Sequence, residues 1–183
     1  YMDCPDRERA QWWGDEVNEL GEAFYALSPS GQKLAVKGIH ELMNWQREDG
    51  TLYAPVPAGN WDKELPLQML ASVGWYGFYT QYYYSADSSF VPMIYDRMRR
   101  YLHEVWQVDK SGLVIERQGA WSWGDWGEHV DMGVLTNCWY YLALKAERAF
   151  ALQLGKDKDA DEISRMMRSI ERCFDTKFWT GSA

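Results

Sequence analysis

The sequence of 183 residues is poor in the side chains that build disulfide frameworks and metal sites. It has only three histidines, which do not cluster, and three cysteines, Cys4, Cys138 and Cys173. An odd, widely spaced set of cysteines forms no disulfide framework and lacks the spacing of metal ligands. We therefore expect neither a disulfide scaffold nor a metal site, and no cofactor.

Long apolar runs and an excess of basic residues are also missing. The chain has 19 Lys and Arg against 27 Asp and Glu, a net charge of −8. This balance argues against nucleic acid as a partner, and no segment is apolar for long enough to span a bilayer. No secretory signal is visible. Because the chain opens inside a motif at Tyr1, we expect a domain truncated at both ends, in a periplasmic, secreted or cytoplasmic protein.

Tryptophan, by contrast, is abundant. The chain has 11 tryptophans and is 46% hydrophobic, which suits one compact domain with a real core. Four of the tryptophans lie in Gly-rich, polar stretches: Trp61, Trp121, Trp123 and Trp126. Large aromatics in loops point to binding more strongly than those in helices, because loops lie at the surface.

The apolar periodicity predicts an all-α chain. The expected helices cover residues 4–27, 31–47, 64–84, 89–108, 131–154 and 158–173. The connections after the first, third and fifth helices are short, and short connections join antiparallel neighbours. The chain is therefore predicted to form three helical hairpins. Residues 51–62 are expected to be loop rather than strand because they contain two prolines and a glycine, and residues 112–115 are expected to form a short strand.

This arrangement brings unusual stretches of sequence together. The long connections and the first turns of the first, third and fifth helices all fall at one end of the bundle. The stretches from Asp3 to Asp15, from Asn60 to Glu64 and from Trp121 to His129 fall there too. The pattern predicts a polar, aromatic rim that binds a ligand, with helix dipoles favouring negative charge.

The opening stretch is the densest part of that rim. It reads Asp3-Cys4-Pro5-Asp6-Arg7-Glu8-Arg9-Ala10-Gln11-Trp12-Trp13-Gly14-Asp15. An Asp before a Pro is typical of the start of a helix. A helix running on from there places Glu8, Trp12 and Asp15 along one stripe. Carboxylates beside an indole suit a sugar site; the alternative is that these acids only complement the helix dipole or form a solvated face.

Three motifs carry a family resemblance. The pattern Asp-Cys-Pro-x-Arg-Glu-Arg followed by Trp-x-Gly-Asp resembles the signature of bacterial α-L-rhamnosidases, whose catalytic domain is an (α/α)6 barrel. Glu64-Leu65-Pro66-Leu67-Gln68 with Trp75 resembles, in divergent form, the second barrel segment of that family, and Gly124-Asp125-Trp126 matches its Gly-Asp-Trp loop. Three hairpins are half of such a barrel, so residues 1–183 would be a partial barrel domain.

The resemblance implies roles for individual residues. Glu8 would be the general acid of an inverting hydrolase, and the general base would lie in the second half of the barrel, beyond residue 183. Substrate-binding roles would fall to Asp3, Arg7, Trp12, Asp15, Glu64, Trp75, Asp125 and Trp126. The implied partners are a rhamnosylated glycan or glycoside, the remaining half of the barrel and accessory β domains, with neither nucleic acid nor membrane.

Other interpretations of these residues stay open. Asp3 could serve only as a helix cap, Trp75 could be a core residue, and Glu64 could be a first-turn acid. Two other functions also fit the sequence. One is an (α/α)6 glycosidase for a different sugar, and the other is a helical carbohydrate-binding module without chemistry.

Overall fold

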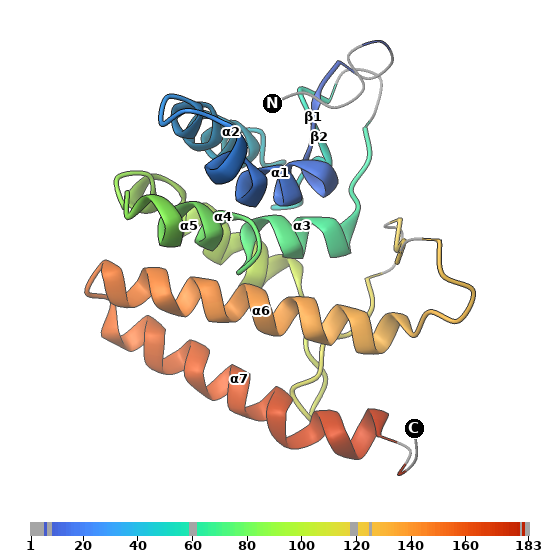
Figure 1. Cartoon of the computed structure of the whole chain (residues 1–183). Helices are drawn as coiled ribbons and strands as arrows, with labels where there is room; N and C mark the ends of the chain where they lie inside the picture. Colours follow the sequence, from blue (N-terminus) through green and yellow to red (C-terminus); the bar gives the residue numbers. More distant parts are fainter. Residues whose placement is uncertain are drawn as a thin grey trace.

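The computed structural model describes residue 6 and residues 9–58, 62–117, 121–124, 126–179 and 181. Helices dominate this part of the chain, as predicted (Figure 1). They are α1 Trp13–Ala26, α2 Gly31–Asn44, α3 Pro66–Val73, α4 Phe78–Ser85, α5 Val91–Arg100 with its π-helical extension η1 Tyr101–Val105, α6 Met132–Gln153 and α7 Asp157–Phe178. A two-stranded antiparallel pair joins β1 Gln11–Trp12 to β2 Pro55–Val56.

The helices stack as antiparallel hairpins (Figure 1). The first hairpin is α1 with α2, the second is α3 and α4 with α5, and the third is α6 with α7. Helix α3 lies between α1 and α6 and contacts both. The first turns of α1, α3 and α6 point to the same end, at the right in Figure 1, where the two long connections also lie. The predicted convergence at one end of the bundle is therefore confirmed.

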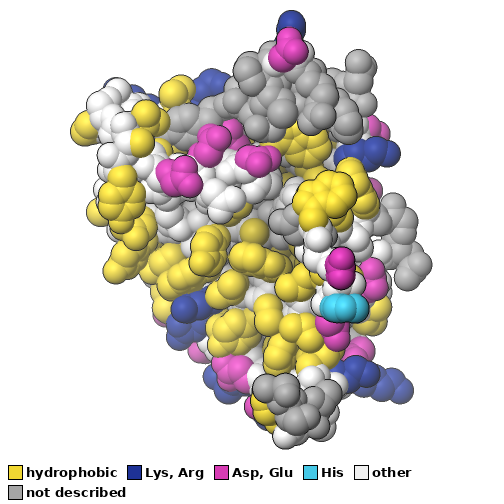
Figure 2. Space-filling view, turned by 45° about the vertical axis from the view of Figure 1, so that its right-hand side comes forward, with side chains coloured by type: hydrophobic (Ala, Val, Ile, Leu, Met, Phe, Trp, Pro, Cys, Tyr) yellow, Lys and Arg dark blue, Asp and Glu magenta, His cyan; other side chains and the backbone are white. Residues whose placement is uncertain are grey.

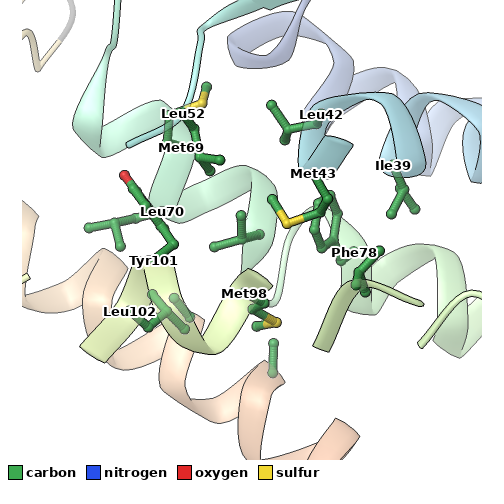
Figure 3. Packing of buried hydrophobic residues seen from close by; sticks show 14 of the residues in the cluster. Ile39, Leu42, Met43, Leu52, Met69, Leu70, Phe78, Met98, Tyr101 and Leu102 are labelled. Atoms are coloured by element: carbon green, nitrogen blue, oxygen red, sulfur yellow. The ribbon is translucent and has the colours of Figure 1, made fainter. Parts of the chain in front are cut away.

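The core fills the space between the hairpins (Figure 3). Side chains from α2, α3, α4, α5 and η1 meet there, together with one from the connection after α2. Each apolar side chain of this size stabilises the fold by about 1.5–3 kcal/mol when fully buried. The labelled members, all under 2% exposed, are Ile39, Leu42, Met43, Leu52, Met69, Leu70, Phe78, Met98, Tyr101 and Leu102. In the described part of the chain, no helix is both long enough and apolar enough to cross a membrane.

The prediction of a helix starting near Cys4 is wrong. Helix α1 starts at Trp13, and Gln11 and Trp12 instead form β1, opposite Val56 and Pro55. The Trp13 N–H also donates to the Ala54 carbonyl (2.9 Å). The predicted helical stripe therefore loses its Trp12 member. The expectation of no strand in residues 51–62 is wrong for the same reason, because the two segments satisfy each other's main-chain groups.

The predicted helix over residues 64–84 is two helices, broken between Val73 and Phe78. A Cβ on Gly74 would lie 3.0 Å from the Ala143 Cα of α6, so the glycine lets two backbones meet closely. A Cβ on Gly77 would lie 1.9 Å from the Ser72 carbonyl oxygen, which is why the chain can turn back on α3 there.

Other boundaries differ by a few residues. The predicted helix over residues 89–108 ends at Val105, with its last turn widened into the π-helical η1. Helix α2 stops at Asn44 rather than at residue 47, and α7 continues to Phe178 rather than ending at residue 173. The expected strand at residues 112–115 is reduced to a single bridge between Val108 and Val114.

Candidate functional site

A pocket of about 400 Å³ opens between the first turns of α1, α3 and α6. Its volume lies within the range of small-molecule sites in proteins. The described residues that line it are Gly14, Val17, Asn18, Leu67, Gln68, Ala71, Tyr76, Trp123, Gly124, Leu135 and Trp139. Figure 2 turns the right-hand side of Figure 1 forward, and hydrophobic side chains gather in patches over this face.

Hydrogen bonds fix the helix ends around the pocket. The buried Ser72 hydroxyl of α3 lies 2.9 Å from the Trp13 carbonyl and 2.7 Å from the Gln68 carbonyl, so it ties α3 to the start of α1. The Asp131 side chain accepts from the Val134 N–H (3.0 Å) and caps α6. The pocket is thus framed by helix ends rather than by loops alone.

Aromatic side chains form one side of the pocket and its mouth. Tyr76 and Trp139 meet edge to face, with ring centroids 5.7 Å apart. Trp123 stacks with Trp121 at 6.1 Å and meets Trp126 edge to face at 5.4 Å. Trp121 is 50% exposed and Trp126 is 88% exposed, so apolar ring surface is offered to a ligand. Rings of this kind combine a large apolar surface with a polar edge.

The polar groups on the described walls of the pocket are uncharged. Among the described lining residues, none carries a charge, and the polar side chains include the amides of Asn18 and Gln68. The Oε1 atom of Gln68 is buried and has no hydrogen-bond partner in the described part of the chain. The described walls therefore favour a neutral ligand that offers both apolar surface and hydrogen-bonding groups.

Glu64 lies just before α3 in a buried ion pair. Arg117 donates to both of its oxygens, at 2.7 Å each, and the Tyr101 hydroxyl donates to Oε1 at 3.2 Å. Burial and, after it, the negative charge of Glu64 hold the pKa of Tyr101 well above its usual value, so this hydroxyl keeps its proton. Glu64 thus joins the connection before α3 to the connection before α6.

Trp75 lies away from the pocket. The Tyr79 ring stacks on it with centroids 3.8 Å apart, and the Lys145 ammonium lies 3.8 Å from its ring centroid. Two groups this close must cover opposite faces of the indole. Trp75 instead borders a separate groove of about 470 Å³ over α6 and α7, while its neighbour Tyr76 lines the pocket.

The family assignment follows from the whole chain. Residues 1–183 match the model of the bacterial alpha-L-rhamnosidase 6 hairpin glycosidase domain. The chain belongs to this family. Its hairpins are about half of the family's (α/α)6 barrel, so the predicted fold class is confirmed.

Two solved structures of rhamnosidases share the fold. The alpha-L-rhamnosidase from Dictyoglumus thermophilum superposes with a TM-score of 0.80 at 20% identity, over 98% of this chain and 20% of that one. The GH78 family rhamnosidase of Bacillus sp. GL1 gives a TM-score of 0.82 at 19% identity, over 98% of this chain and 19% of that one. This chain thus spans about a fifth of their length. Nothing among curated protein sequences matches it.

The remaining residues that the family motif singles out differ in where they lie. Trp12 is 8% exposed, packed where β1 meets α1, and Asp15 lies exposed in the first turn of α1. Trp126 meets the ring of Trp123, which lines the pocket, edge to face. The segments carrying Asp15 and Trp126 therefore reach the same end of the domain, whereas Asp3, Arg7, Glu8 and Asp125 lie outside the described residues.

Four polar or aromatic side chains that line the pocket were not predicted from the sequence. They are Asn18, Gln68, Tyr76 and Trp139. Gln68 stands inside the motif quoted for the second barrel segment, and Asn18 lies four residues after Gly14, on the same face of α1. These two positions could have been identified from the sequence. Tyr76 and Trp139 sit in apolar helical runs that look like core.

Metal ligation has no candidate among the described residues. No three or more His, Cys, Asp and Glu side chains gather there in a way that could hold an ion. Cys138 and Cys173 are free thiols, and burial raises the pKa of Cys138.

Proposed function

We propose that this domain is part of a glycoside hydrolase that releases terminal α-L-rhamnose from a glycan or glycoside. The observation that carries the proposal is the aromatic pocket between α1, α3 and α6, whose described lining residues are uncharged and include Gly14 of the opening motif. Membership of the rhamnosidase hairpin family supports the same substrate class. The pocket offers flat rings for the apolar face of a sugar and amides for its hydroxyls.

The proposed mechanism is inverting. Glu8, in protonated form, gives its proton to the leaving oxygen, while a carboxylate on the opposite side of the sugar activates a water molecule; the two carboxyl groups stand about 6.5–9.5 Å apart so that the water fits. That general base belongs to the second half of the barrel, outside residues 1–183. Asp3 and Asp15 favour the protonated form of Glu8 through like-charge repulsion, and Arg7 binds Asp3 or a sugar hydroxyl.

The other proposed contacts follow the family motif. Trp12 and Trp126 form walls for the terminal sugar, and Asp125 binds its hydroxyls. Direct contact of Glu64 and Trp75 with the substrate also stays a prediction. In the structure Glu64 is held by Arg117 and Trp75 is covered by Lys145, so both would have to act through a rearrangement or in the complete barrel.

A second candidate is a hydrolase of the same fold that acts on a different sugar. It is favoured by one observation, namely that Tyr76 and not Trp75 lines the pocket, so the second barrel segment departs from the family pattern at the site. The two candidates differ in substrate and share Glu8 as the acid.

The test uses the full-length protein and a panel of aryl glycosides. Wild-type protein should hydrolyse the α-L-rhamnoside, and Glu8→Gln should lower kcat at least ~10²-fold on an unactivated rhamnoside, the scale of lost general-acid help. Glu22→Gln, on an exposed glutamate of α1, is the matched control. Near-normal turnover by Glu8→Gln would remove Glu8 from the role. Hydrolysis of another sugar alone would favour the second candidate.

A further inference from the structure

The amide of Gln68 is a hydrogen-bonding group that the fold leaves unused. It lies in α3 and lines the pocket. Its Oε1 is buried without a partner, and its Nε2 forms no hydrogen bond within the part of the chain that the structure describes. A buried acceptor left unpaired is unfavourable, and among the described side-chain atoms without a partner, Gln68 Oε1 is the one whose residue lines the pocket.

Gly14 of α1 provides the seat for this amide. A Cβ at position 14 would lie 2.5 Å from Gln68 Oε1, 2.6 Å from Cδ and 2.9 Å from Nε2. The amide therefore occupies the space that a side chain at position 14 would fill.

The backbone itself does not require a glycine there. The glycines with positive φ in the described chain are Gly50, Gly112, Gly155 and Gly181, and Gly14 is not among them. Near the start of a helix, glycine is also less favourable than alanine. The room that it gives to the Gln68 amide is what accounts for it.

We propose that Gln68, seated on Gly14, is a specificity-determining residue that binds a hydroxyl of an uncharged sugar. This deepens the proposed function and rests on it. The Nε2 donates to a sugar oxygen, and because the last torsion of a glutamine side chain is broad, the amide can also turn its Oε1 to accept from a hydroxyl. Asn18 offers a second amide to the same pocket.

The surroundings define the class of sugar. None of the described lining residues carries a charge, so these residues offer no cation to pair with the carboxylate of a uronic acid. Tyr76, Trp123 and Trp139 supply ring surface for the apolar face of a neutral pyranose. The described lining therefore favours a neutral sugar with a hydroxyl facing Gln68.

The first experiment is kinetic, on the full-length protein with the aryl glycoside that it hydrolyses. Gln68→Leu, which keeps the approximate size but removes both polar atoms, should raise KM about tenfold, the scale of one lost hydrogen bond in a site. The melting temperature should stay unchanged. Gln107→Leu, on an exposed glutamine far along the chain, is the matched control and should keep the wild-type KM.

The second experiment asks which hydroxyl Gln68 binds. Aryl glycosides that each lack one hydroxyl are compared in wild type and in Gln68→Leu. The analogue without the relevant hydroxyl should lose affinity in the wild type but lose nothing further in the variant, because the two changes remove the same bond. Losses that add fully for every analogue would overturn the assignment, since a purely structural glutamine would give that result.

Gly14→Ala tests the seat without removing the amide. The added Cβ meets only the flexible end of Gln68, so the protein should fold while the amide is displaced. KM should rise as in Gln68→Leu, and the double variant should show no additional rise. A wild-type KM in Gly14→Ala would contradict the proposed seat.

The outcomes separate this inference from the rhamnosidase proposal. If wild type hydrolyses only another neutral sugar and Gln68→Leu raises that KM, the role of Gln68 stands and rhamnose specificity fails. If wild type hydrolyses the rhamnoside and Gln68→Leu has the same KM for it, the proposed function stands and the role of Gln68 is overturned. If no aryl glycoside is cleaved, the affinities for free L-rhamnose, other neutral sugars and a uronic acid are measured by calorimetry. Tighter binding of the uronic acid, or no binding of any neutral sugar, overturns the inference.

Discussion

Two polar side chains near the start of α3 differ in their hydrogen-bond partners. Glu64, two residues before the helix, is 8% exposed and engages Arg117 and Tyr101 with its carboxylate. Gln68, one turn further on, faces the pocket with an amide that no described residue satisfies. The difference separates two uses of polarity. Glu64 holds two connections together, whereas the Gln68 amide faces the pocket without a described partner.

The same contrast appears on α6. Glu147 is fully buried, and His103 lies 2.9 Å and Arg99 lies 3.6 Å from its carboxylate. Arg99 also pairs with Glu162 of α7 at 2.7 Å. This network ties α5 and η1 to α6 and α7. Trp139, two turns earlier on α6, lines the pocket instead. Helix α6 thus has one section that ties the helices together and another that lines the pocket.

Removing Arg117 should have the largest effect on stability. Arg117→Met leaves Glu64 buried without its cation, and breaking a buried pair in this way costs about 3–5 kcal/mol. Urea unfolding of the full-length protein, followed by tryptophan fluorescence, should show the loss as a lower midpoint. Arg165→Met, at an exposed position of α7, is the control. An unchanged midpoint in Arg117→Met would mean that Glu64 is not held by this pair.

A smaller loss is expected when the tie between α3 and α1 is cut. Ser72→Ala removes a buried hydroxyl that lies 2.9 Å from the Trp13 carbonyl. The free energy of unfolding should fall by about 1 kcal/mol, the usual net value of one such bond. Because this tie frames the pocket, KM should rise modestly as well. A stability loss with an unchanged KM would show that the pocket does not depend on this contact.

The smallest effect on stability should come from Gln68 itself. Gln68→Leu removes no hydrogen bond within the described protein, so the free energy of unfolding should change by less than about 0.5 kcal/mol. The same variant should bind substrate less well. Equal losses in stability for Gln68→Leu and Arg117→Met would contradict the distinction between a structural Glu64 and a ligand-binding Gln68.

Loop lengths and periodicity were enough to predict the all-α hairpins and the shared end of α1, α3 and α6, because both are encoded locally. The β1–β2 pair was missed because it joins Gln11 to Val56 across distant sequence. A strand of two residues, one of them Pro55, leaves no local pattern. The break between α3 and α4 depends on the approach of Gly74 to Ala143, which is likewise a long-range contact.

The candidate site was predicted in outline only. Asp15 and Trp126 were placed at the correct end from their segments. Tyr76 and Trp75 are neighbours in an apolar run, and which of them faces the pocket depends on where α3 ends, which periodicity did not reveal. The pairing of Glu64 with Arg117 was equally invisible, because 53 residues separate them. Side chains that depend on a helix end or a distant partner therefore need the structure.

The most direct test of the account is a crystal structure of the full-length protein with L-rhamnose. The account predicts the sugar in the pocket between α1, α3 and α6, over the rings of Tyr76 or Trp123, with a hydroxyl within hydrogen-bond distance of the Gln68 amide. A sugar bound elsewhere in the barrel, with this pocket holding only solvent, would contradict it.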